Sequence, residues 1–137
     1  MTKDNQRLEH ALNNEEVCNH LSLQPSFQDW IATTAFYAAL QFVTYKIFPF
    51  EISDNKGGKV LVPSLEFYQK RFVSDIKISK HKVLCDLVGK RCPEISPEYD
   101  WLLSISYTAR YNNYRTSPQI ADKAKRLMNE IKKYCNK

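Results

Sequence analysis

The fold class is decided by the stretch Asp29-Trp30-Ile31-Ala32-Thr33-Thr34-Ala35-Phe36-Tyr37-Ala38-Ala39-Leu40, which leaves no polar face on a helix. Its pattern predicts one long helix over about residues 27–48. Ser26 offers an N-cap, with Asp29 at the third helical position, as in a reciprocal cap. A helix that is apolar all round has to be buried all round. One chain can seldom do this in a small bundle, so we expect part of the helix to meet a second copy.

Apolar periodicity predicts four more helices, over about residues 3–23, 64–91, 97–114 and 118–134. The second of these has a break signal near Ser79, and Ser117 with Pro118 forms an N-cap and first position for the last one. Residues 51–63 are predicted to be a surface loop. The apolar stripes of the last two helices predict core positions, namely Leu102, Ile105, Ser106, Ala109, Ile120, Ala124, Leu127, Met128, Ile131 and Tyr134. The sequence therefore predicts a single all-α domain over residues 1–137, built from about five helices.

Most of the net charge of +5 lies near the C-terminal end of the sequence. From residue 117 to 137 there are six Lys and Arg against two acids, so six minus two gives this segment +4. Helical spacing places Lys123, Arg126, Lys133 and Lys137 on one face. A basic stripe of this kind suits phosphate groups. The alternative is a solvated helix face without a ligand, which is common for charge runs.

A second candidate site is the stretch Tyr107-Thr108-Ala109-Arg110-Tyr111-Asn112-Asn113-Tyr114-Arg115. Four of its side chains share one side of a helix: Tyr107, Arg110, Asn113 and Tyr114. The planar fork of Arg fits a phosphate, while Tyr stacks on bases and Asn bonds to their edges. The alternative is that Arg110 is structural, paired with Asp29 or Asp100, and that the tyrosines pack.

The four cysteines, Cys18, Cys85, Cys92 and Cys135, include no Cys-x-x-Cys pair. Together with the absence of an apolar leader, they predict reduced thiols in a cytoplasmic protein, most of them core residues. A metal site would depend on His81 and Cys85, which are four residues apart. Two further ligands at zinc spacing are missing, so we expect neither a metal nor a cofactor.

Residues 30–50 are the one candidate for a membrane segment. Gln41 and Lys46 interrupt this run, and Pro49 ends it. A spanning helix needs about 20 mostly apolar residues. We therefore predict a buried core helix and no membrane contact.

Three groups of these residues resemble HEPN-domain proteins. Asp29-Trp30 with residues 36–40 resembles their first long helix, and Ser79-Lys80-His81 resembles the start of a later one. The third match is Leu102-Leu103 leading to residues 107–111. The resemblance covers about residues 19–115, and the stretch over residues 51–78 is longer than is usual in that family. It implies an up-and-down helical bundle that commonly dimerises. Many such proteins are metal-independent ribonucleases of toxin–antitoxin and defence systems, often encoded beside a nucleotidyltransferase.

The resemblance also implies a catalytic motif of Arg, a polar residue, several more residues and then His. Arg110 matches the arginine, but Tyr111 takes the polar place and no histidine stands at 115–117. Arg115 stays protonated and cannot act as a base. A tyrosine such as Tyr114 ordinarily titrates at about pH 10, which makes it a poor base at neutral pH. Loss of general acid–base help costs about a hundred- to ten-thousand-fold in rate. We therefore expect a degraded or absent nuclease site, unless His81 enters it from another helix.

Together these observations predict a HEPN-like homodimer, built on the helices over 27–48 and 97–114, that binds RNA, a nucleotide or a partner protein. The expected phosphate-binding residues are Arg110 as anchor, Asn113, Tyr114 and Arg115 beside it, and Lys123, Arg126 and Lys133 for long-range attraction. A nucleotidyltransferase-type protein is the partner that the resemblance implies. Two alternatives stay open: a metal-independent ribonuclease toxin that uses Arg110 as a catalytic residue, and a protein-interaction subunit that binds no nucleic acid. The missing histidine argues against the first, and the basic last helix against the second.

Overall fold

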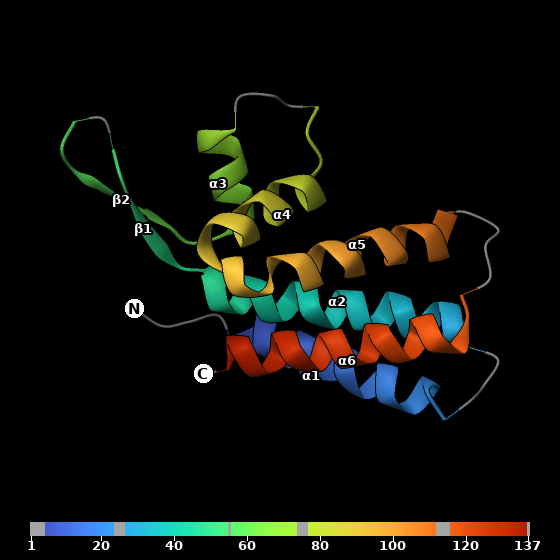
Figure 1. Cartoon of the computed structure of the whole chain (residues 1–137). Helices are drawn as coiled ribbons and strands as arrows, with labels where there is room; N and C mark the ends of the chain where they lie inside the picture. The colour runs from blue at the N-terminus through green and yellow to red at the C-terminus, as the bar shows by residue number, and fades with distance from the viewer. Residues whose placement is uncertain (1–4, 24–26, 55, 74–76, 112–115, 137) are drawn as a thin grey trace.

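The computed structural model describes residues 5–23, 27–54, 56–73, 77–111 and 116–136, without the side chains of Arg110 and Tyr111. In these ranges the chain forms six α-helices, one short 3-10 helix and one β-hairpin. Their bounds are α1 (Asn5–Leu21), α2 (Gln28–Ile47), β1 (Phe50–Ser53), β2 (Lys59–Val62), α3 (Leu65–Phe72), α4 (Lys80–Arg91), the 3-10 helix η1 (Pro93–Ile95), α5 (Ser96–Tyr111) and α6 (Pro118–Cys135). Helices α1, α2, α5 and α6 lie side by side, whereas α3, α4 and the hairpin lie at one end of this bundle (Figure 1).

Helix α2 is the centre of the bundle and contacts α1, α4, α5 and α6. Its apolar side chains are buried on several sides, including Ile31, Phe36 and Val43. Four helices of the same chain thus pack against α2, and the expectation that part of it also meets a second copy stays a prediction. Trp30, in the first turn, keeps 60% of its surface exposed.

Three threonines lie inside this apolar helix without breaking it. Thr33, Thr34 and Thr44 each donate a hydrogen bond to the carbonyl four residues earlier, at 2.9, 2.8 and 2.7 Å. A hydroxyl that is satisfied by its own helix can be buried at little cost. The threonine hydroxyls that interrupt the apolar pattern of α2 are therefore compatible with the central position of this helix in the bundle.

The start of α2 differs from the predicted reciprocal cap. Phe27 occupies the N-cap position and makes no capping bond with its side chain, while Ser26 lies outside the described residues. Asp29 instead accepts a hydrogen bond from the backbone N–H of Thr116, at 2.8 Å. This bond joins the first turn of α2 to the residue that precedes the N-cap Ser117 of α6.

Residues 51–63 were expected to be a loop, and this was wrong. They contribute to an antiparallel hairpin in which Phe50 pairs with Val62 and Ser53 with Lys59. The carboxylate of Asp54 accepts hydrogen bonds from the N–H groups of Lys56 and Gly58, and Gly57 has a φ of 81°. Glycine at this φ and an Asp that bonds to the turn backbone are the usual determinants of a tight turn.

The remaining predictions of helices were largely confirmed. The 64–91 segment forms two helices, of which α3 ends at Phe72 and α4 begins at Lys80. Ser79 caps α4 by accepting a hydrogen bond from the N–H of Lys82 at 3.2 Å. Ser117 caps α6, accepting from the N–H of Ile120 at 3.2 Å. The predicted stripes contribute the buried residues Leu102, Ser106, Ala124, Leu127, Met128 and Ile131, whereas Ile105, Ala109, Ile120 and Tyr134 are half-buried.

All four cysteines are free thiols, and three of them, Cys18, Cys92 and Cys135, are buried as expected. None of the helices in the described part of the chain combines the length and the apolar character that a membrane span needs.

Candidate functional site

A cleft of about 990 Å³ lies between α4 and α5. Its walls carry polar side chains at four-residue spacing, with Lys82, Asp86 and Lys90 on α4 and Asp100, Ser104 and Thr108 on α5. Ser79, His81, Cys85, Gly89, Ser96, Leu103 and Tyr107 complete the lining. The same spacing is visible in the sequence, but only the packing of α4 against α5 turns two polar helix faces into one site.

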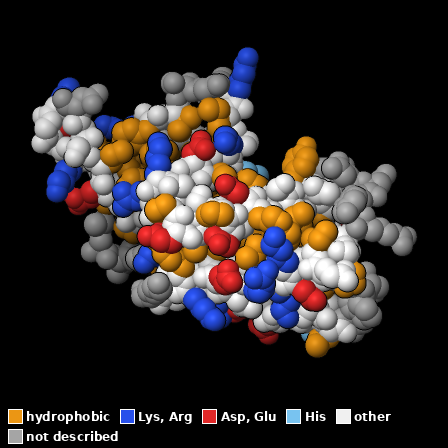
Figure 2. All heavy atoms as spheres, viewed as in Figure 1, with side chains coloured by type: hydrophobic (Ala, Val, Ile, Leu, Met, Phe, Trp, Pro, Cys, Tyr) orange, Lys and Arg blue, Asp and Glu red, His pale blue; other side chains and the backbone are white. Residues whose placement is uncertain are grey.

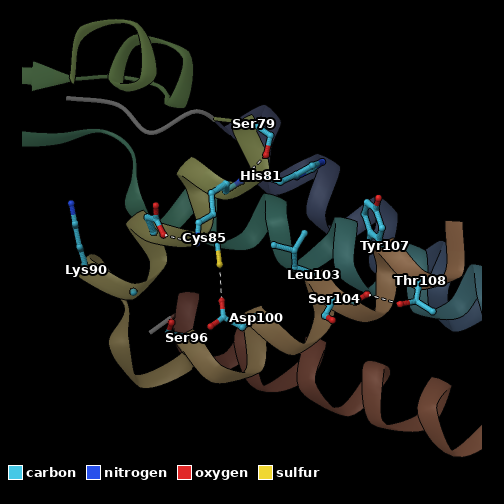
Figure 3. Close-up of a pocket in the computed structure, with 13 residues that line it drawn as sticks. Ser79, His81, Cys85, Lys90, Ser96, Asp100, Leu103, Ser104, Tyr107 and Thr108 are labelled. Carbon is cyan, nitrogen blue, oxygen red and sulfur yellow. Dashed lines mark hydrogen bonds and ion pairs between the residues drawn. The ribbon is translucent and has the colours of Figure 1, made fainter. Parts of the chain in front are cut away.

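The cleft is narrow at one end and wide at the other. The short turn over residues 92–95 joins α4 to α5, so the helices meet at Gly89 and Ser96, where a Cβ on the glycine would lie 3.6 Å from the serine Oγ. From there they diverge toward Ser79 on α4 and Thr108 on α5 (Figure 3). A ligand therefore has most room beside the C-terminal half of α5.

The middle of the cleft is bridged by Cys85 and Asp100. The thiol donates a hydrogen bond to the carboxylate Oδ1, with the sulfur 2.6 Å from the oxygen (Figure 3). Burial and then this carboxylate raise the pKa of the Cys85 thiol to about 12. The thiol is therefore protonated at neutral pH and is a poor nucleophile. Sequence spacing gave no sign of this pair, because its members are 15 residues apart on different helices.

Replacement of Asp100 should make Cys85 more reactive. In Asp100→Asn the negative charge that disfavours the thiolate is removed, so the pKa of Cys85 should fall from about 12 toward its ordinary value of 9.0. We expect alkylation by iodoacetamide at pH 8.5 to become roughly tenfold faster, because the rate follows the thiolate fraction. Peptide mass spectrometry would measure the rate at Cys85, with Asp122→Asn on α6 as the matched control. Equal rates in Asp100→Asn and the unmodified protein would contradict this account.

Two rings face the wide end of the cleft from opposite walls. His81 on α4 is half-buried and packs edge-on against the buried ring of Phe36, with centroids 5.7 Å apart. Tyr107 on α5 has 57% of its surface exposed. Lys82, also on α4, lies 3.4 Å from Asp86 in an exposed ion pair. The wide end thus offers aromatic surface, hydroxyl groups and the cation Lys82, whose ion pair with Asp86 is exposed to solvent.

The predicted anchor Arg110 lies three residues beyond Tyr107, near the end of α5. Its side chain is not described, and Asn113, Tyr114 and Arg115 lie outside the described residues altogether. The proposed role of these four residues, and the alternative pairing of Arg110 with Asp29 or Asp100, thus remain predictions.

The basic face of α6 is less open than its composition suggests. Lys125 donates to the hydroxyl of Ser22, just after α1, at 3.1 Å, and Lys132 forms a 2.8 Å ion pair with the half-buried Glu15 of α1, so both side chains join α6 to this part of the chain. The ammonium of Lys123 lies 4.5 Å from the centre of the Trp101 ring. Long basic side chains that cover apolar surface in this way are partly structural.

Three of the predicted phosphate-binding residues, Lys123, Arg126 and Lys133, are exposed, and Lys137 lies outside the described residues. Asp122 and Glu130 are exposed on the same helix. Figure 2 accordingly shows acidic and basic side chains interspersed over α5 and α6. The positive electrostatic potential of this face is weaker than the net charge of +4 over residues 117–137 implies, because the neighbouring acids offset part of the charge.

Helix α5 separates this basic face from the cleft, since α4 and α6 pack on different sides of it (Figure 1). His81 and Cys85 line the cleft together. Within the described ranges, however, no group of three or more His, Cys, Asp or Glu side chains is placed to hold a metal ion.

The cleft, rather than the basic face of α6, is thus the best-defined candidate site. Comparison with known proteins adds no family to this description, because no protein-family model, no curated protein and no solved structure matches the chain.

Proposed function

We propose that this chain is a HEPN-like helical module that binds single-stranded RNA or a nucleotide in the cleft between α4 and α5. The observation that supports this most directly is the composition of the cleft. It combines an exposed aromatic ring, Tyr107, with the cations Lys82 and Lys90 and a series of hydroxyl groups. Proteins that bind single strands use stacking surfaces beside positive charge in the same way.

The cleft also extends toward the proposed anchor. Tyr107 and Thr108 line its wide end, and Arg110 follows on the same helix. An RNA strand lying in the cleft would pass the C-terminal turn of α5. The exposed cations of α6, on the other side of α5, would then attract the strand without contacting the base in the cleft.

The proposal can be tested by the salt dependence of RNA binding. Fluorescence anisotropy with a fluorescein-labelled 12-nucleotide RNA would give affinities between 50 and 200 mM NaCl. The double variant Lys82→Ala/Lys90→Ala should bind this RNA roughly tenfold more weakly. The slope of log K against log salt concentration should become shallower by about 1.4, since each lost phosphate contact removes about 0.7 from the slope. Lys56→Ala/Lys59→Ala in the hairpin is the matched control and should bind like the unmodified protein.

Absence of salt-dependent RNA binding at 50 mM NaCl would refute the proposal and leave the protein-interaction role. Replacement of Lys123, Arg126 and Lys133 together by Ala should weaken binding to all sequences alike, because these side chains are expected to contact phosphates only. The homodimer and a nucleotidyltransferase-type partner belong to the same proposal. The dimer would use α2, where Trp30 is exposed, and not the face of α5 that carries Leu103 and Tyr107, because those two side chains line the cleft.

The second candidate function is a metal-independent ribonuclease, and one observation favours it. His81 lines the same cleft as Tyr107, three residues before Arg110, which supports the proposal that a histidine from α4 replaces the one that the motif lacks. As general base it would take the proton of a 2′-hydroxyl, whose oxygen attacks the adjacent phosphorus. The bond from phosphorus to the 5′-oxygen then breaks and this oxygen takes a proton from the His81 imidazolium through water, which leaves a 2′,3′-cyclic phosphate and a 5′-hydroxyl. Cleavage of the labelled RNA that is lost in both His81→Gln and Arg110→Ala would establish this activity.

A further inference from the structure

The wide end of the α4–α5 cleft has the features of a site for a single nucleobase. Tyr107 presents an exposed ring from α5, and His81 presents a second ring from α4. The imidazole of His81 is held in place by its edge-on contact with Phe36, and the Phe36 ring itself packs 5.8 Å from the buried ring of Tyr99. The position of His81 is therefore fixed by three helices, α2, α4 and α5, before any ligand binds. A preorganised ring of this kind loses little entropy on stacking.

Charge determines which way a nucleotide would lie. Asp100 bridges to Cys85 in the middle of the cleft, so the carboxylate there disfavours a phosphate. Lys82, nearer the wide end, is paired with Asp86, but both side chains are more than half exposed. An exposed ion pair is worth little, so Lys82 can exchange the carboxylate of Asp86 for a phosphate oxygen.

The polar groups of the α5 wall would then face the edge of the base. The hydroxyl of Thr108 donates to the carbonyl of Ser104 at 3.2 Å, so its proton is used and its oxygen stays an acceptor. The Ser104 side chain is exposed in the same wall. The Ser104 hydroxyl can both donate and accept, so this wall accommodates several bases instead of selecting one. The volume of the cleft, about 990 Å³, lies within the usual range of small-ligand sites, roughly 300–1,000 Å³.

We propose that the wide end of this cleft binds one base of single-stranded RNA between Tyr107 and His81, with the adjoining phosphate on Lys82. The proposal rests on the RNA-binding function described above and assigns its base subsite. Recognition is by stacking, so it is tolerant of sequence.

The test compares three single variants in the anisotropy experiment with the 12-nucleotide RNA. Tyr107→Leu keeps an apolar side chain but removes the ring, and we expect roughly tenfold weaker binding, since stacking one base contributes about 1–3 kcal/mol. Tyr107→Phe keeps the ring and should bind within about twofold of the unmodified protein. Trp30→Leu removes an equally exposed ring that does not line the cleft, and it should also change binding by less than about twofold.

The salt slope separates stacking from charge. Tyr107→Leu should keep the slope of the unmodified protein, because no phosphate contact is lost. Saturation-transfer NMR with uridine 5′-monophosphate and the unmodified protein gives a result that does not depend on any variant folding. The base protons should receive more saturation than the ribose protons if the base is enclosed between two rings.

The two proposals fail in different ways. If the unmodified protein binds RNA and Tyr107→Leu binds it equally well, the base subsite is wrong and RNA binding takes place elsewhere. Saturation of the ribose protons in preference to the base protons would likewise overturn the subsite. If the unmodified protein does not bind RNA at all, the proposed function fails and the subsite fails with it.

Discussion

Phe36→Ala is expected to lower the free energy of unfolding by about 3–5 kcal/mol, the usual cost of deleting a buried phenylalanine ring. Phe36 is fully buried and lies at the junction of α2, α4 and α5. Its ring contacts those of Tyr37, His81 and Tyr99, with centroids 5.3, 5.7 and 5.8 Å apart. Aromatic pairs add about 0.5–1.5 kcal/mol beyond the area that they bury.

Urea denaturation followed by circular dichroism would measure this loss as a lower midpoint with an unchanged m-value. Phe72→Ala is the matched control, because Phe72 lies on α3 and is partly exposed, so its loss should cost about 1 kcal/mol or less. Similar midpoints for the two variants would show that Phe36 is not the packing centre described here.

Asp29→Ala should cost about 1.5–3 kcal/mol, the range for a hydrogen bond to a charged group. The Asp29 carboxylate is the acceptor for the backbone N–H of Thr116, and Thr116 is buried. In the variant this N–H has lost its acceptor in a place where water reaches it poorly. The acid in the first turn of α2 also interacts favourably with the positive end of the helix dipole.

The matched control is Asp29→Asn, which keeps an oxygen acceptor and should lose less than half as much stability. Hydrogen exchange of the Thr116 amide, followed by NMR, should become faster in Asp29→Ala and much less so in Asp29→Asn. Unchanged protection of this amide in Asp29→Ala would show that the bond does not stabilise the start of α6.

Helices α2, α5 and α6 were predictable because their apolar patterns extend over 16 or more residues, and α6 also begins at the cap that its sequence predicts. The hairpin was missed because its strands have four residues each, too short for alternation to outweigh a turn-rich composition. Its stability comes from outside the hairpin, since Phe50 is buried and the Arg91 guanidinium lies 4.4 Å from the centre of its ring.

The candidate site was predictable only in part. Tyr107 was singled out from its neighbours in the sequence, whereas Asp100 was considered only as a partner of Arg110. The Cys85–Asp100 bond depends on how two helices pack, which no local pattern encodes. Charge was misleading for the same reason, because Lys132 counts as a surface cation in the composition but forms an ion pair with Glu15, 117 residues away along the chain.

The central position of α2 also has a consequence for synthesis on the ribosome. Its apolar surface is covered by α1, which precedes it, but also by α5 and α6, which follow much later in the chain. At about 5–20 residues per second, the ribosome needs on the order of 5–20 s to deliver those two helices after α2 has emerged. During this interval the nascent chain carries α1 and the apolar α2 without the two helices that complete the cover of α2. Slow translation between residues 47 and 118 would therefore prolong the exposure of the apolar surface of α2.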